Sequence, residues 1–166
     1  MQGPVKPPVA GMEPIEFAAW GGFLRAHAAL RRVLDRELQE AHQLPLTEFE
    51  VLLWLANRPD GRMRMAEVAS SMLLSQGGTT RLVERLERQG LVRREPCAED
   101  RRGAYAVLTD AGRTRVRAAR RTHVAGVRAH FLRHFAPEDL TQLAAFWTRI
   151  LDDQPAGAPG CADAGG

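Results

Sequence analysis

The chain has 166 residues, of which 45% are apolar and 26% charged, and its formal net charge at pH 7 is +3. These values are ordinary for a soluble globular protein and suit one domain, or one compact lobe with an oligomerisation element. No run approaches the roughly 20 apolar residues that cross a membrane, and no signal-peptide layout is present. Cys97 and Cys161 lie far apart, so we expect no structural disulfide and a location in the reducing cytoplasm.

The charge is unevenly distributed along the chain. Between Arg58 and Arg121 there are 15 Arg and 8 Asp or Glu, whereas the remainder carries a net charge of −4. A basic middle between acidic flanks predicts a lobe that binds a polyanion, carried on a separate scaffold. Residues 1–12 and 154–166 are rich in Pro, Gly and Ala and are expected to be disordered tails.

A long helix is predicted from Glu13 to about His42, with Pro14 in its first turn, where the missing N–H costs nothing. At 1.5 Å per residue this helix is roughly 42 Å long, which is more than a small lobe covers. Part of its apolar stripe is therefore expected to meet another chain. The stripe, at steps of three and four, is Trp20, Phe23, Leu24, His27, Leu30, Val33 or Leu34, Leu38 and Ala41.

The next helix is predicted to be short and buried, because apolar residues occupy most of its sides. Thr47 is expected to cap it, with Glu50 three residues on completing a capping box, and it should end near Asn57.

Two further helices with a tight junction are predicted over residues 66–73 and from Ser75 to about Gln89, with Gly90 just after the second. The second helix turns polar and basic residues outward. This arrangement is typical of a helix-turn-helix motif. The residues expected to point inward from the second helix are Thr79, Leu82, Val83 and Leu86.

Leu91–Glu95 and Ala104–Leu108 are predicted to pair as a β-hairpin wing with a polar, basic loop. Thr109 is expected to cap a second long helix through about Phe135, and Pro137 to open a last helix whose apolar face packs against the first. The predicted fold is mainly α with a small β-hairpin wing (α+β). A winged helix-turn-helix lobe (47–109) sits on an all-helical dimerisation scaffold (13–42 and 110–153).

Several short motifs occur at the expected places of this arrangement. They are Ser75 with Thr80-Arg81-Leu82-Val83, Arg85-Leu86-Glu87, Gly90-Leu91-Val92, and Asp100-Arg101-Arg102 followed by Leu108-Thr109 and Ala111-Gly112. With these motifs, residues 15–153 resemble the MarR family of bacterial winged helix-turn-helix regulators. The resemblance implies a cytoplasmic homodimer whose terminal helices interlock and whose two lobes read a palindromic operator. It also implies a repressor that a small ligand releases from double-stranded DNA. Ala66 departs from the family pattern, which commonly has a Ser or Thr cap there.

The residues expected at the DNA lie on the wing and on the second helix of the helix-turn-helix motif, the recognition helix. Gln can make a bidentate contact to adenine and Arg to guanine in the major groove. Arg102 is expected in the minor groove, with Asp100 orienting it. The alternative to DNA contact is that these residues form an ordinary solvated surface with ion pairs such as Glu84–Arg88. The complete predicted DNA-binding set is Ser75, Gln76, Gly77, Thr80, Arg81, Arg85, Arg93, Arg94, Arg101 and Arg102.

Other candidate sites are weaker. His123, His130 and His134 are spaced for zinc, but without a CxxC or HExxH pattern neither a metal nor a cofactor is expected. A redox role for Cys97 competes with that of a tolerated loop cysteine. A pocket for a small-molecule effector competes with ordinary core packing. The candidate pocket residues are Trp20, Phe23, His27, Phe49 and Trp54.

No nucleophile–base pair, Gly-rich phosphate loop or paired-carboxylate motif stands out, so the chain is not expected to be an enzyme. The alternatives to a sequence-specific regulator are a low-specificity or architectural DNA-binding protein and a zinc-responsive regulator of the same fold.

Overall fold

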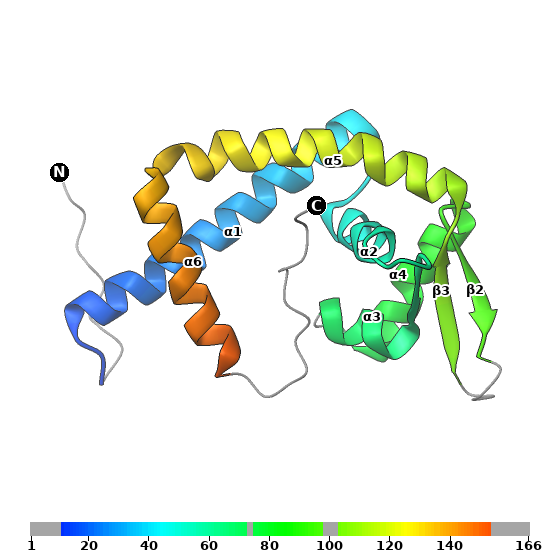
Figure 1. Ribbon diagram of the computed structural model, residues 1–166, viewed down its shortest axis with the longest axis horizontal. Helices are drawn as coiled ribbons and strands as arrows, with labels where there is room; N and C mark the ends of the chain where they lie inside the picture. The colour runs from blue at the N-terminus through cyan, green and yellow to red at the C-terminus, as the bar shows by residue number, and fades with distance from the viewer. Residues whose placement is uncertain (1–10, 73–74, 98–102, 154–166) are drawn as a thin grey trace.

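The computed structural model describes residues 11–72, 75–97 and 103–153 and is mainly helical with one small sheet. The sheet and α2–α4 gather at one end, α6 and the start of α1 lie at the other, and α1 and α5 run between them (Figure 1). This confirms the predicted fold class. In chain order the elements are α1 (Pro14–His42), α2 (Leu46–Ala56), β1 (Arg62–Arg64), α3 (Met65–Met72), α4 (Gln76–Arg88), β2 (Val92–Pro96), β3 (Ala104–Leu108), α5 (Asp110–His130), a 3-10 turn (Leu132–His134) and α6 (Pro137–Asp152).

The sheet contains a strand that the sequence did not predict. This strand is β1. The strand order of the sheet is β1-β3-β2, with antiparallel neighbours, and Met63 of β1 lies opposite Ala106 of β3. Met63 is buried between the half-buried Arg62 and Arg64. This alternation is that of a strand, but three residues are too few for the pattern to be recognised in a sequence.

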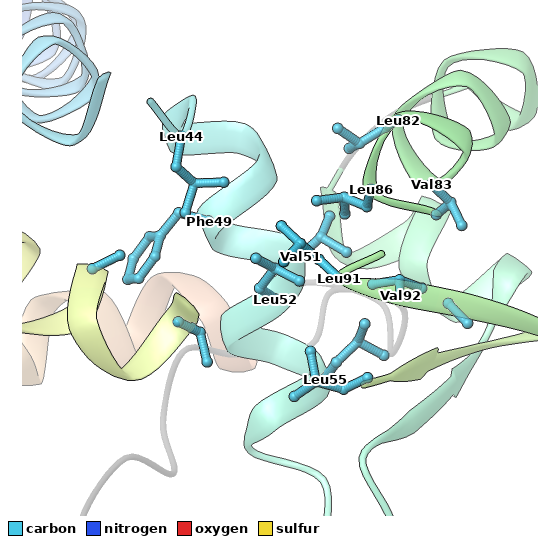
Figure 2. Close-up of a cluster of buried hydrophobic side chains, with 14 of the residues drawn as sticks. Leu44, Phe49, Val51, Leu52, Leu55, Leu82, Val83, Leu86, Leu91 and Val92 are labelled. Atoms are coloured by element: carbon cyan, nitrogen blue, oxygen red, sulfur yellow. The ribbon is translucent and has the colours of Figure 1, made fainter. Parts of the chain in front are cut away.

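The hydrophobic core lies between α2, α4, the sheet and the first half of α5. Figure 2 shows Val51 of α2 lying close to Leu86 of α4, whereas Phe49 of α2 points the other way, toward α5. Burying one such side chain contributes about 1.5–3 kcal/mol relative to leaving it exposed, so α2 and α4 are firmly held. The four residues predicted to point inward from α4 are confirmed as buried: Thr79, Leu82, Val83 and Leu86.

Two predicted caps are confirmed. The Oγ of Ser75 accepts the backbone N–H of Gly78 at 3.1 Å at the start of α4. The Oγ1 of Thr109 accepts that of Gly112 at 3.0 Å at the start of α5. Gly90 has φ +70°, the left-handed conformation expected just after α4.

The predicted capping box at Thr47 is wrong. The N-cap is Pro45, two residues before Thr47, and Asp35 of α1 accepts the backbone N–H of Leu46, the first residue of the helix, at 2.8 Å. Glu50 does not turn back to the helix start, because both of its oxygens bind the guanidinium of Arg31, at 2.7 and 3.2 Å. A side chain from another helix has replaced the local cap.

The second long helix ends earlier than predicted. Its last residue is His130, and a 3-10 turn follows in place of a continued helix to Phe135. Phe131 and Phe135 contact each other with ring centroids 5.0 Å apart. Their four-residue spacing is also that of a helix, so it concealed the break.

Two glycines let α5 approach its neighbours closely. A Cβ at Gly112 would overlap the carbonyl oxygen of Leu91, where the recognition helix turns into the wing. A Cβ at Gly126 would overlap Glu37 and come within 2.7 Å of Leu34 on α1. The helix is thereby fixed at one end to the base of the wing and at the other to α1.

We predict that Gly112→Ala destabilises the protein by about 1–3 kcal/mol, because the added methyl group meets backbone that cannot move without disturbing the sheet. Gly77→Ala is the matched control, since a Cβ there meets nothing within 4 Å. It should stabilise the protein by up to about 1 kcal/mol. Urea unfolding measures both, and a loss of stability in Gly112→Ala no larger than in the control would contradict the close approach.

A second prediction concerns His123, whose ring packs on Phe49 and whose buried Nδ1 has no hydrogen-bond partner among the described residues. Burial lowers the pKa of His123 from its ordinary 6.5, and the negative charge of Glu50 opposes this to a smaller extent. The unfolded chain therefore binds the proton more readily. The contribution of neutral His123 to the free energy of unfolding is full above pH 6.5. It is lost as pH falls from 6.5 toward the folded-state pKa of His123.

Replacing His123 by Phe keeps the aromatic contact and removes the titrating group. Unfolding free energies at about pH 7.5 and pH 5.5 should differ less in His123→Phe than in the unmodified protein. His134→Phe, at an exposed histidine, controls for the loss of an imidazole as such. An equal acid sensitivity in His123→Phe and the unmodified protein would show that His123 does not contribute to it.

Candidate nucleic-acid interface

The outer face of α4 carries a stripe of exposed residues at helical spacing: Gly77, Arg81, Arg85 and Arg88. Buried residues occupy the opposite face, so core packing leaves this stripe for a partner. The side chain of Gln76 lies outside the described residues. The other residues predicted for DNA contact in this helix all keep access to solvent, and they are Ser75, Gly77, Thr80, Arg81 and Arg85.

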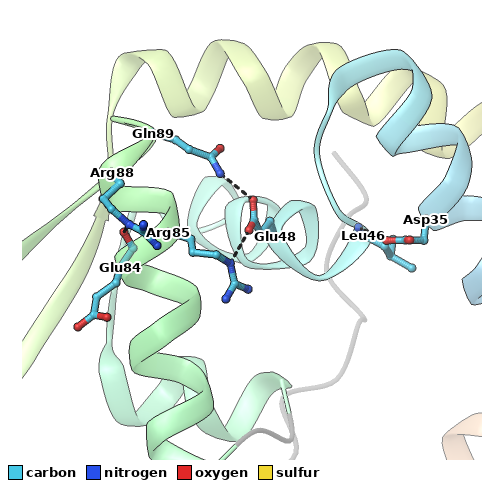
Figure 3. Close-up of polar contacts among 7 residues, drawn as sticks. All are labelled: Asp35, Leu46, Glu48, Glu84, Arg85, Arg88 and Gln89. Atoms are coloured by element: carbon cyan, nitrogen blue, oxygen red, sulfur yellow. Dashed lines mark hydrogen bonds and ion pairs between the residues drawn. The ribbon is translucent and has the colours of Figure 1, made fainter.

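Arg81 and Arg85 differ in environment although both lie on this stripe. The Nε of Arg85 donates to Glu48 Oε1 at 3.0 Å, and Nε2 of Gln89 donates to Glu48 Oε2 at 3.1 Å (Figure 3). Arg81 makes no hydrogen bond or ion pair with the other described residues. Arg81, predicted to contact either a base or a phosphate, is therefore open to a partner, whereas Arg85, predicted to contact a base, is already bound to a carboxylate.

Sequence reasoning missed Glu48. Glu48 is 2% exposed and lies in a helix that was correctly expected to be buried on most sides. A carboxylate in such a helix must find hydrogen-bond donors, since an unpaired buried charge is very costly. The position of Glu48 was thus a signal of a buried ion pair, but the sequence does not say which arginine supplies it.

The base of the wing is tied to the recognition helix by Arg94 of β2. Its backbone N–H and Nε donate to the two oxygens of Glu87, at 3.2 and 2.8 Å, and its Nη1 lies 3.7 Å from Glu84 Oε1. The suggested Glu84–Arg88 carboxylate pair is absent among these residues, because Arg88 bonds to the backbone carbonyl of Glu84 instead. Exposed pairs contribute only about 0–1 kcal/mol each, so Arg94 mainly sets geometry.

Two more arginines lie beside the wing, and the sequence did not single them out. The guanidinium carbon of Arg62 lies 3.9 Å from the ring centroid of Tyr105, and that of Arg64 lies 5.4 Å from it. Arg93, a predicted phosphate contact, pairs with Glu95. The Arg-Met-Arg alternation of β1 was the available signal. The wing tip, with Asp100, Arg101 and Arg102, lies outside the described residues, so these predictions stay predictions.

Comparisons with known proteins identify the fold. Residues 42–103 match the MarR family. The structure is similar to that of AbsC, a MarR family transcriptional regulator from Streptomyces coelicolor, with 35% identity and a TM-score of 0.79 over 87% of this chain and 97% of AbsC. The chain belongs to the MarR family. Sco3205, a MarR family transcriptional regulator from the same organism solved in complex with DNA, is 32% identical, with a TM-score of 0.81 over 87% of this chain and 95% of Sco3205.

Curated relatives agree with this assignment. The HTH-type transcriptional regulator PecS of Dickeya dadantii is 28% identical over 78% of each chain. YkoM, an uncharacterized HTH-type transcriptional regulator of Bacillus subtilis, is 37% identical, and the match spans 54% of this chain and just 56% of YkoM. The prediction that the chain is a transcriptional regulator and not an enzyme is confirmed.

This MarR-family chain does not bring its three candidate histidines together. His123 packs on Phe49, His130 Nε2 lies 2.6 Å from Glu37 Oε1, and His134 accepts from Arg133. No group of three His, Cys, Asp or Glu side chains in the described ranges is placed to hold a metal ion. The geometry therefore lends no support to a zinc-responsive regulator.

The five candidate residues of the effector pocket lie in two separate parts of the structure. Phe23 contacts Trp20 and His27 on α1, with centroids 5.8 and 6.1 Å apart. Phe49 is instead fully buried in the core of the lobe, and Trp54 is half-buried against that core. A pocket that unites the five residues stays a prediction.

Two remaining predictions concern the rest of the MarR-family chain. Cys97 is 5% exposed at the end of β2 and forms no disulfide with a described residue. Within the described ranges, no helix has the length and apolar character needed to cross a bilayer.

Proposed function

We propose that this protein is a homodimeric repressor that binds a palindromic operator with α4 in the major groove and the wing, through Arg102, in the minor groove. The observation that carries the proposal is the exposed stripe of α4, on which Arg81, Arg85 and Arg88 follow one another at helical spacing. Its relative Sco3205, of the same fold, was solved in complex with DNA. Binding to chromosomal DNA would place the protein in the cytoplasm.

The acidic residues of α4 do not oppose this function. Glu84 and Glu87 both lie within reach of Arg94, so their charges are compensated from the wing side. The stripe itself presents guanidinium groups, which bind phosphates and can read guanine in the major groove.

The proposed dimer follows from apolar surface at the scaffold end. The first half of α1 and the last half of α6 expose large side chains, and Phe23 meets Trp147 with ring centroids 5.5 Å apart. Monomeric proteins rarely expose such extended apolar surface, so we assign it to a second copy. A small ligand that altered the spacing between the two copies would release the DNA. The exposed residues are Ile15, Trp20, Phe23, Leu24, Phe146, Trp147, Ile150 and Leu151.

Selection from a random DNA pool tests the proposed function, and it should enrich a palindrome with half-sites about one helical turn apart. Arg81→Ala should then weaken binding to the enriched operator roughly 5- to 150-fold, the effect of losing one good base contact. Arg120→Ala removes an exposed arginine of α5 as a matched control and should change affinity little. Equal weakening by both variants and no enriched sequence would instead indicate low-specificity binding.

Ile150→Glu tests the dimer. Ile150 is 53% exposed in the protomer, so a charge there should leave the protomer folded while preventing association. Ala145→Glu places the same charge on the opposite side of α6, since five residues turn a helix by about 140°. Sedimentation velocity should show a monomer for the first variant and a dimer for the second. Two dimers would exclude the α6 apolar face from the interface.

A further inference from the structure

The carboxylate of Glu48 is the most deeply buried charge among the described residues. It lies on α2 between core residues, and its side chain is 3% exposed. Such a group is tolerated only when donors satisfy both oxygens, and here Arg85 and Gln89 supply one each. The two donors are one helical turn apart at the C-terminal end of α4. Glu48 thus binds the end of the recognition helix from inside the lobe.

The bond to Glu48 fixes only part of Arg85. Its Nε is used at 3.0 Å, while its side chain remains 47% exposed. Figure 3 shows the two terminal nitrogens extending beyond the carboxylate. A guanidinium is planar and carries its donors in a fixed fork, so holding Nε also sets the direction of the other two nitrogens. Those two nitrogens form the edge that a bidentate contact to guanine requires.

Stability alone does not explain a carboxylate at this place. Replacing a buried ion pair by apolar side chains of similar volume is often neutral or stabilising. The neighbours of Glu48 on α2 include Phe49, Val51 and Leu52, all buried, so an apolar residue would suit the site. A flexible arginine, by contrast, loses rotamer entropy when it binds, and a partner that orients it in advance reduces that loss.

We propose that Glu48 is a positioning residue for sequence recognition, which holds Arg85 so that its terminal nitrogens meet a guanine of the operator. The inference rests on the proposed function, in which α4 lies in the major groove. A contact from Arg85 to a phosphate is the competing possibility. It predicts that Arg85 affects all DNA sequences alike, because phosphates carry no sequence information.

The chain offers a matched control on the same helix. Glu50 also binds an arginine, Arg31, but that arginine belongs to α1 and not to the recognition helix. Glu50→Met and Glu48→Met therefore each remove one carboxylate–arginine pair of α2. Only Glu48→Met releases Arg85.

The experiment begins with the operator obtained from the random pool by the unmodified protein. If no sequence is enriched, the proposed function fails before the inference is tested. Arg85→Ala is then measured on operators changed one base pair at a time, to find the guanine at which it no longer discriminates. If Arg85→Ala weakens every operator equally, Arg85 reads no base and the inference is overturned, although the proposed function stands.

At that guanine, Glu48→Met should lose discrimination roughly 5- to 150-fold while binding to unrelated DNA stays within about twofold. Its unfolding midpoint should not fall, because Met matches Glu in length and leaves half-exposed Arg85 and exposed Gln89 to water. Glu48→Gln, which keeps an acceptor, should retain more discrimination than Glu48→Met. Unchanged discrimination in Glu48→Met, or an equal loss in Glu50→Met, would overturn the proposal.

A folding failure of Glu48→Met would still leave a decisive measurement. Glu48→Gln and Arg85→Lys are then combined in a double-mutant cycle on the ratio of affinities for the two operators. If Glu48 acts through Arg85, the two losses overlap and the double variant loses less than their product. Fully multiplicative losses would show that Glu48 acts independently of Arg85.

Discussion

The rest of the structure depends on the burial of α2. Its apolar side chains form the centre of the lobe core, so its polar groups must be satisfied by neighbouring elements. Leu46 N–H and Glu50 reach Asp35 and Arg31 of α1, and Glu48 reaches Arg85 of α4. A single buried helix therefore fixes the recognition helix relative to the scaffold through directional bonds, in addition to the non-directional packing of its apolar side chains.

A second connection runs through α5 and is steric. At one end of α5, Gly112 brings the helix against the carbonyl of Leu91, and at the other Gly126 brings it against Leu34 and Glu37 of α1. The contact at Gly112 is with backbone and leaves no room for a Cβ, whereas the contact at Gly126 is with side-chain atoms of Glu37 and Leu34. A shift of α5 would therefore disturb the base of the wing directly. In the proposed dimer, the placement of α1 therefore determines the placement of both DNA-contacting elements, α4 through α2 and the wing through α5.

How far the sequence predicts this fold depends on how local each signal is. The Ser75 and Thr109 caps, the left-handed Gly90 and the buried face of α4 are set by residues within one turn, and all were predicted. The failed cap at Thr47 had a correct local pattern, but Asp35, eleven residues before Leu46, supplied the acceptor instead. The missed strand β1 is held by its pairing with β3, and three residues are too few to show the alternation of a strand in the sequence.

For the candidate site too, the sequence shows how many charges there are but not which of them pair. The excess of arginine between residues 58 and 121 indicated a polyanion partner, because the summed charge of a lobe sets the sign of the potential over its surface. At contact distance, orientation matters more than count. Arg85 and Arg94 are paired with Glu48 and Glu87, whereas Arg81 pairs with no described residue. Pairing leaves the net charge of the lobe almost unchanged and fixes where each guanidinium points. Arg85 therefore meets a partner already oriented by Glu48, whereas Arg81 loses its rotamer entropy only when the partner binds.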